Sequence, residues 1–220
     1  MPEGIDTVPV RIIEDFYEWQ TVVEAPVVEK FFPGIFDVKT CLYVGIRPED
    51  WGDCEHPNGL EQALRRIHAK VSGVDGMEIW PGYVKRLRKK PPLWLTYLWE
   101  MDICDIRTRL AIQPVRYDLV IWWHGPQHAV SEKAGLLGLA NCEYLCLGQV
   151  LLGMPWGVSQ NTLSAGLEGE PDNPYEAHGW EVTPEKLDEL GYDVVALNCR
   201  RPEEKDRTAC GHLIGVKSVR

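Results

Sequence analysis

Tyr117-Asp-Leu-Val-Ile-Trp-Trp123 is the clearest strand in the chain, a run of seven mostly apolar residues that His124-Gly-Pro follows directly. A short apolar run bounded by turn residues is typical of a strand buried on both faces of a sheet. Similar runs recur on both sides of this one, so the sequence predicts six further strands. We expect them at residues 40–45, 76–80, 93–101, 149–153, 192–197 and 212–217.

Helical patterns separate most of these strands, at residues 58–70, 81–90, 128–140 and 184–190. Strands that alternate with helices imply parallel strand pairing, with helices covering both faces of the sheet. We therefore expect an α/β fold of three layers. Its centre would be a Rossmann-like, doubly wound, mostly parallel seven-stranded sheet, with helices on both faces.

Residues 1–35 are expected to form a helical extension in front of this domain, which would span residues 36–220. Pro33-Gly34 marks the boundary as a turn. The helix is predicted from apolar residues at helical spacing: Ile12, Ile13, Phe16, Trp19, Val22 and Val23.

Composition narrows the class of protein. The 220 residues carry a formal net charge of −10, which weighs against a nucleic-acid binder that relies on phosphate contacts. No run of about 18 apolar residues occurs, and the first residues lack the pattern of a signal peptide. The seven cysteines include no CxxC pair, which favours reduced thiols. We expect a cytoplasmic protein with no membrane span and no nucleic-acid partner.

Polar residues and glycines at the strand ends indicate a ligand site, because doubly wound sheets bind ligands outside the carboxyl ends of their strands. Gly45 follows the first predicted strand, Glu78 lies in the second, and Asp102 follows the third. Glycine lets the backbone approach a ligand closely. A carboxylate at the second strand end can accept hydrogen bonds from the two hydroxyls of a ribose. An acid after the third can meet an adenine amino group.

This order of features resembles the class I S-adenosylmethionine-dependent methyltransferases over about residues 38–200. The best match is the run 117–128, in which Gln127-His128 stand where the family has an "EH" turn. A second match is the series Gly153-Met-Pro-Trp-Gly157, Gln160, Asn173-Pro-Tyr-Glu176, His178 and Trp180, which precedes Leu190-Gly-Tyr-Asp-Val194.

The resemblance implies that Gly45, Glu78 and Asp102 contact the cofactor, and that Ile103 flanks its adenine. The family's first motif usually reads D-x-G-x-G, whereas this chain has Tyr43-Val-Gly-Ile-Arg47. Arg47 would either obstruct the methionine part of S-adenosylmethionine or pair with its carboxylate.

Four tryptophans fall at or just after predicted strand ends: Trp80, Trp122, Trp123 and Trp156. If they line one cleft, a tryptophan face could attract the sulfonium cation or stack on an aromatic group. Trp80 and Trp122 are the candidates for cofactor contact. The alternative for each of them is core packing beside the sheet.

Three histidines are candidates for acid–base work: His124, His128 and His178. Histidine titrates near neutral pH, which suits a general base that takes a proton from a methyl acceptor. The spacing of His124 and His128 also allows a metal site. A third alternative is a structural role, in which each ring bonds a backbone carbonyl.

The sequence thus predicts an S-adenosylmethionine-dependent methyltransferase that acts on an oxygen or nitrogen of a small-molecule acceptor and yields S-adenosylhomocysteine. The N-terminal helix and the polar loop 158–180 would cover the substrate side. The altered first motif motivates an alternative, a methyltransferase fold kept as a catalytically inactive binding protein. A metal-dependent enzyme built on the three histidines is a further alternative. A homodimer is compatible with the sequence.

Overall fold

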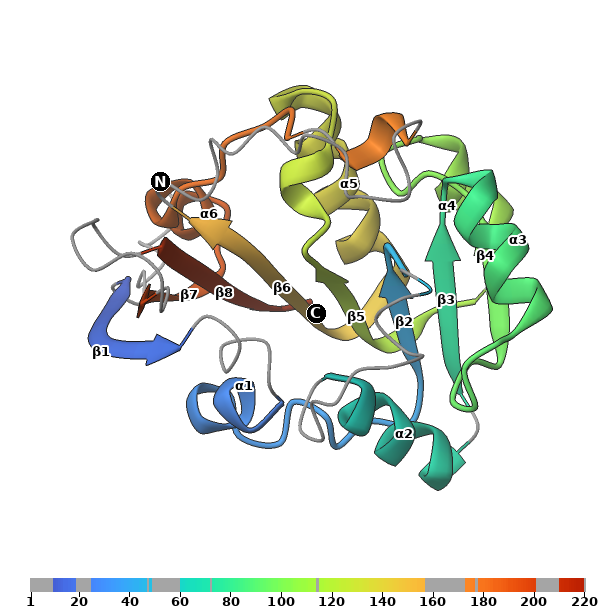
Figure 1. Cartoon of the computed structure of the whole chain (residues 1–220), viewed down its shortest axis with the longest axis horizontal. Helices are drawn as coiled ribbons and strands as arrows, with labels where there is room; N and C mark the ends of the chain where they lie inside the picture. Colours follow the sequence, from blue (N-terminus) through green and yellow to red (C-terminus); the bar gives the residue numbers. More distant parts are fainter. Residues whose placement is uncertain are drawn as a thin grey trace, which may run out of the picture.

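The computed structural model describes residues 10–18, 25–46, 48, 60–71, 73–113, 115–156, 173–176, 178–200 and 210–219. Eight strands form one sheet, in the order β1-β7-β8-β6-β5-β2-β3-β4 (Figure 1). The strands are β1 (Arg11–Glu18), β2 (Cys41–Val44), β3 (Val74–Glu78), β4 (Tyr97–Glu100), β5 (Tyr117–Trp123), β6 (Cys146–Trp156), β7 (Asp193–Arg200) and β8 (Cys210–Ser218). The helices are α1 (Ala25–Phe31), α2 (Leu60–Val71), α3 (Pro81–Lys89), α4 (Arg107–Ala111), α5 (Glu132–Leu145) and α6 (Pro184–Glu189), with 3₁₀ turns η2 (Pro126–His128) and η4 (Pro174–Glu176).

The sheet is doubly wound about β2. From β2 the chain runs outward through β3 and β4, then returns to the other side of β2 for β5 and β6. All of these strands pair in parallel, and only β8 runs antiparallel, between β6 and β7. The switch point of the strand order therefore lies between β2 and β5, where such sheets bind ligands.

Strict alternation along β2 and β5 builds a core on each face of the sheet. Leu119, Ile121 and Trp123 face a cluster that also holds residues of α1 and α2. Val120 and Trp122 face the opposite cluster, which holds residues of α5 and α6. Both faces are covered, as a parallel sheet requires, and the predicted three-layer α/β fold is confirmed.

Side-chain caps fix the starts of two of these helices. Ser131 accepts a hydrogen bond from the Ala134 amide at the start of α5, and Thr183 accepts one from the Lys186 amide at the start of α6. Each cap satisfies an amide that has no partner inside its helix, typically stabilising it by about 1 kcal/mol.

The predicted helix over the first residues is wrong in part. Residues 11–18 form β1, which pairs in parallel with β7 and adds an eighth strand to the predicted seven. Ile12 and Ile13 are β-branched residues that suit a strand, and pairing with β7 gives the backbone hydrogen-bond partners that outweigh the helical spacing. The helix α1 begins only at Ala25. Trp19, Val22 and Val23 lie outside the described residues.

The other elements agree with the sequence predictions except at their ends. The strand expected at 93–101 is shorter, because Pro91 and Pro92 precede a turn that leads into β4 at Tyr97. The helix expected at 128–140 begins at Glu132, after the 3₁₀ turn of Pro126–His128. The short helix α4 was not predicted. Most of the expected loop 158–180 lies outside the described residues.

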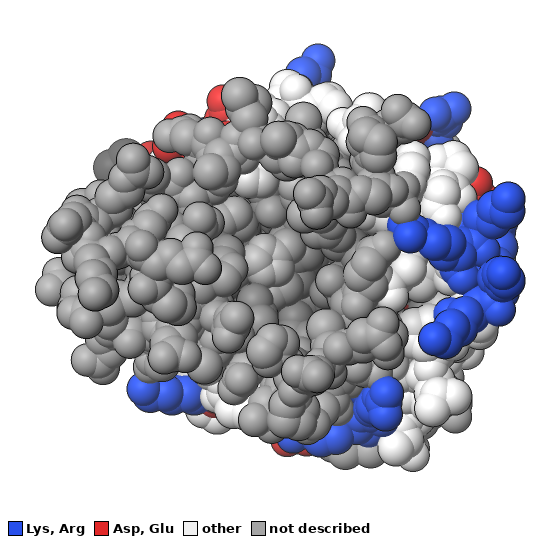
Figure 2. All heavy atoms as spheres, in the orientation of Figure 1, with Lys and Arg blue, Asp and Glu red and all other residues white. Residues whose placement is uncertain are grey.

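The length of the helices and the distribution of charged side chains both bear on function. Within the described ranges, no helix is both long and apolar enough to cross a membrane. Lys and Arg side chains gather on the side of the molecule where α3 lies (Figure 2). They include Arg86, Arg88 and Lys89 in the last turn of α3, where positive charges interact favourably with the negative end of the helix dipole.

Candidate active site

A cavity of about 260 Å³ opens at the carboxyl ends of β2, β3 and β5, at the switch point of the sheet. Five of the predicted cofactor contacts line it together: Gly45, Glu78, Asp102, Ile103 and Trp122. These residues come from four separate chain segments. The sheet topology thus brings the predicted cofactor residues to one place.

Gly45 forms the turn directly after β2. Its φ of +79° lies in the left-handed region, which favours glycine, and a Cβ placed there would meet no atom within 4 Å. Its amide donates to the carbonyl of Met77 at 2.8 Å, which ties the turn to β3. Glycine is therefore required here by backbone conformation, and the space beside it stays open to a ligand.

Glu78 is a buried carboxylate at the last position of β3. Its Oε1 accepts hydrogen bonds from the amides of Ile79 at 3.0 Å and Trp80 at 2.7 Å. The side chain is thereby held at the strand end, against the wall of the cavity. A fixed carboxylate in this position can accept hydrogen bonds from ligand hydroxyls without first being ordered.

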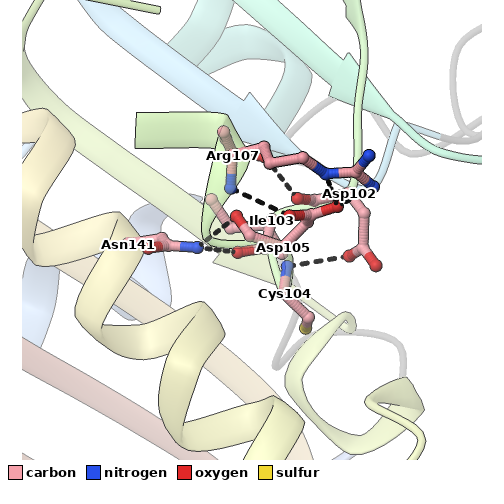
Figure 3. A network of polar contacts seen from close by, with 7 residues as sticks. Asp102, Ile103, Cys104, Asp105, Arg107 and Asn141 are labelled. Atoms are coloured by element: carbon pink, nitrogen blue, oxygen red, sulfur yellow. Dashed lines mark hydrogen bonds and ion pairs between the residues drawn. The ribbon is translucent and has the colours of Figure 1, made fainter. Parts of the chain in front are cut away.

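Asp102 and Ile103 belong to the turn that follows β4 (Figure 3). Asp102 Oδ1 accepts a hydrogen bond from the Cys104 amide at 2.7 Å, and the carbonyl of Asp102 accepts one from Thr108 Oγ1 at 2.6 Å. Ile103 is 5% exposed and presents an apolar wall. An acid next to an apolar wall suits a planar base that carries a polar edge.

Cys104 also lines the cavity and was not assigned to the site from the sequence. Burial, and then the charge and hydrogen bond of Asp102, raise the pKa of the Cys104 thiol to about 12. The thiol is therefore protonated at neutral pH. It serves the site as an apolar surface and not as a nucleophile.

Of the four tryptophans at strand ends, only Trp122 lines the cavity. A Cβ on Gly125 would lie 2.0 Å from its ring, and one on Gly138 would lie 2.6 Å from it, so both glycines pack directly on the indole. The expectation that several tryptophans share one cleft is wrong. Trp123, the next residue along β5, points to the opposite face of the sheet, where it contacts Gly153 and His212.

His124 lines the cavity and has a backbone conformation that is uncommon for residues other than glycine. Its φ is +52°, the only positive value of a non-glycine residue in the described part of the chain, and its amide donates to the Gly153 carbonyl at 2.7 Å. Such strain often accompanies a functional position. The ring lies 5.2 Å from that of His212, a fully buried residue of β8.

His128 lines the cavity as well, and its ring meets that of His178 edge-on, with centroids 4.9 Å apart. His178 is not among the cavity-lining residues. The amide of Gly179 donates to the Gln127 carbonyl, which joins this segment to the turn that carries His128. The three predicted histidines thus belong to two ring pairs. Within the described ranges, no group of three or more His, Cys, Asp or Glu residues could hold a metal ion.

One predicted cofactor contact within the described residues, Trp80, does not line the cavity. Trp80 packs on Tyr83, with ring centroids 4.5 Å apart, and over it lies the guanidinium of Arg86. Tyr83 in turn lines the cavity, so Trp80 supports the wall from behind. Arg47 lies outside the described residues. Lys85, Arg88, Lys89 and Lys90 of the basic run after Tyr83 are exposed, and Arg88 pairs with Glu100.

The cavity also contains residues that the sequence did not single out, such as Tyr83, Ala129, Val130 and Ala134. Asn173 and Tyr175 were quoted only as part of the family-like series, and both line the cavity. Their place in that series was the available signal. Nothing local in the sequence marks Tyr83.

Comparison with known proteins supports the fold. No protein-family model matches the sequence, and no curated protein sequence matches it. Among solved structures, the chain resembles the N-methyltransferase NodS from Bradyrhizobium japonicum in complex with S-adenosylhomocysteine, at a TM-score of 0.54 and 10% identity over 91% of each chain.

Two other methyltransferase structures give similar values. Magnesium protoporphyrin IX methyltransferase from Synechocystis, with bound S-adenosylhomocysteine, matches at a TM-score of 0.52 and 14% identity over 90% of this chain and 81% of its own. The CurJ carbon methyltransferase matches at 0.54 and 18% over 88% of this chain, which spans 53% of the CurJ chain. The protein therefore has the fold of class I S-adenosylmethionine-dependent methyltransferases.

Proposed function

We propose that this protein is an S-adenosylmethionine-dependent methyltransferase that acts on an oxygen or nitrogen of a small molecule. The observation that supports it most is the convergence of Gly45, Glu78 and Asp102 on one cavity at the switch point of the sheet. These residues come from three strand ends, which the parallel pairing of β2, β3 and β4 brings to one edge of the sheet. The likeness to methyltransferase structures at 10–18% identity supports the fold only.

The residues fit S-adenosylmethionine in their chemistry. Gly45 leaves open space beside its backbone, Glu78 offers a fixed acceptor for ribose hydroxyls, and Asp102 offers an acceptor for the adenine amino group. Ile103 and Trp122 supply apolar walls. A carboxylate that accepts hydrogen bonds from a ligand contributes about 1.5–3 kcal/mol per bond.

His124 and His128 line the same cavity and are the groups that could serve a methyl acceptor. When bound, S-adenosylmethionine supplies a methyl group on a sulfonium, which transfers by in-line displacement and needs mainly positioning from the protein. A neutral histidine can take the proton that an attacking hydroxyl or amine releases. His178 supports the ring of His128 by edge-on contact.

Calorimetric titration with S-adenosylmethionine and S-adenosylhomocysteine tests the proposal. We expect dissociation constants in the micromolar range for both. Absence of binding up to about 1 mM, weaker than about −4 kcal/mol, would contradict it.

Turnover separates this proposal from the inactive binding protein that the altered first motif suggests. A panel of phenols, hydroxy acids and amines is incubated with S-adenosylmethionine labelled in its methyl group, and labelled product is measured. Binding without any methylated product would favour the inactive alternative. His124→Ala in parallel shows whether product formation depends on the cavity.

A further inference from the structure

Asn141 is a polar side chain in the buried face of α5, with no exposed surface. A buried amide that lacks hydrogen bonds is costly, so its partners reveal why a polar residue stands there. Other buried residues of α5, such as Leu139, Cys142 and Leu145, are apolar. Packing alone therefore gives no reason for asparagine at this position.

All three partners of Asn141 lie in or beside the turn after β4, and two of them, Ile103 and Asp105, are labelled in Figure 3. Its Nδ2 donates to the carbonyl of Ile103 at 2.6 Å and to the carbonyl of Asp105 at 2.9 Å. Its Oδ1 accepts a hydrogen bond from Nε of Arg109, which belongs to α4. Only an amide offers two donors and an acceptor in this geometry.

The turn needs such an anchor because β4 is an edge strand. Among the described residues β4 pairs only with β3, so no second strand there positions the residues that follow it. Hydrogen bonds inside the turn, from the Cys104 amide to Asp102 and from Arg107 to Asp105, give it a shape. These bonds do not fix the position of the turn relative to the cavity. Asn141 joins the turn to α5, which packs on the strands of the sheet centre.

We infer that Asn141 is a positioning residue for adenine recognition: it holds the turn so that Asp102 and Ile103 meet the adenine of the cofactor. This inference rests on the proposed function. It places the anchor of the adenine-binding turn 38 residues further along the chain, in a helix that does not line the cavity at that position.

The test compares two ligands that differ at the adenine amino group, S-adenosylhomocysteine and S-inosylhomocysteine. Binding is measured by calorimetry for the wild-type protein, Asn141→Ala and Cys142→Ala. Cys142 is the adjacent, fully buried residue of α5, so its truncation controls for general loosening of the helix. We expect the wild-type protein to prefer S-adenosylhomocysteine by about tenfold, the value of one hydrogen bond.

Asn141→Ala should weaken S-adenosylhomocysteine binding about tenfold and bring the preference close to one. Cys142→Ala should keep the preference. If Asn141→Ala lowers thermal stability but keeps both the affinity and the preference, its role is structural only and the inference falls.

A second variant covers the case in which Asn141→Ala does not fold. Arg109 is only half-buried, and Arg109→Ala removes the bond that orients the Asn141 amide. It should reduce the preference in the same direction, by a smaller factor. An unchanged preference in this variant contradicts the inference. If the wild-type protein binds neither ligand, the proposed function itself fails, which is a distinct result.

Discussion

Gly138 packs its backbone directly against the ring of Trp122: a Cβ at position 138 would lie 2.6 Å from Cη2 of the indole. The same Cβ would lie 3.0 Å from the sulfur of Cys104. Both neighbours line the cavity, so a side chain at this turn of α5 would press on two of the residues that form its wall.

Gly138→Ala should therefore push Trp122 or Cys104 into the cavity. Alanine favours a helix by about 1 kcal/mol over glycine, so a loss of function would come from the clash and not from the helix. We expect about tenfold weaker binding of S-adenosylhomocysteine by calorimetry, since overpacking typically costs 1–3 kcal/mol. Adding Trp122→Phe should restore part of the affinity. Equal affinity in wild type and Gly138→Ala would show that Trp122 and Cys104 can shift without weakening ligand binding.

Glu78 and Glu100 are register partners on β3 and β4, which makes them a matched pair for mutation. Glu78→Ala should weaken S-adenosylhomocysteine binding by about 1–3 kcal/mol, because the ribose hydroxyls lose their acceptor. Glu100 forms a half-exposed ion pair with Arg88 and does not line the cavity, so Glu100→Ala should leave the affinity unchanged. Equal effects of the two variants would remove Glu78 from its proposed role.

Cys104 should resist alkylation in the folded protein. Because its pKa is raised to about 12, mainly by burial, only about one molecule in ten thousand carries the thiolate at pH 8. Peptide mass spectrometry measures the labelling of Cys104 by iodoacetamide. We expect this labelling to be slow and its rate to rise about tenfold per pH unit. Labelling in guanidinium chloride should be fast. Rapid labelling of the native protein at pH 8 would contradict the buried environment.

His212 should make stability depend on pH. Full burial, and then the facing His124, hold the pKa of His212 well below its usual value of 6.5. Below about pH 6.5, His212 binds a proton in the unfolded chain but remains neutral in the folded protein. Stability is thus fully present above about pH 6.5 and is lost as the pH falls, by up to about 1.4 kcal/mol per pH unit.

Urea unfolding of wild type and His212→Asn at pH 7.5 and 5.5 measures this contribution. The wild-type protein should lose more stability between the two pH values than the variant does. Parallel losses in the two proteins would mean that His212 is protonated without hindrance in the folded state. His212→Asn is the informative change because asparagine is polar but does not titrate in this range.

Much of the central sheet could be predicted from local sequence. The strands β2 and β5 are buried on both faces, which leaves nearly continuous apolar runs such as Leu119-Val-Ile-Trp122. Gly45, Glu78 and Asp102 follow or end such runs, and parallel strands bring their carboxyl ends to one edge. The gathering of these three residues at one edge of the sheet could therefore be predicted from the sequence.

The rest depends on contacts between distant segments. Nothing near Asn141 indicates that its amide meets the turn at residues 103–105, and nothing near His212 indicates that it faces His124. The strand β1 forms because it pairs with β7, a strand that lies some 180 residues away in the chain. The local spacing of apolar residues cannot reveal a partner strand so far away in the chain.

The pairing of β1 with β7 has a consequence for synthesis on the ribosome. Arg11 on β1 forms its ion pair with Asp193, 182 residues later, so β1 has no strand to pair with until almost the whole sheet has been made. At about 5–20 residues per second this interval lasts roughly 10–40 s. During that time Ile12 and Ile13 have no partner strand, and the nascent chain is a candidate for holding by a chaperone until β7 emerges.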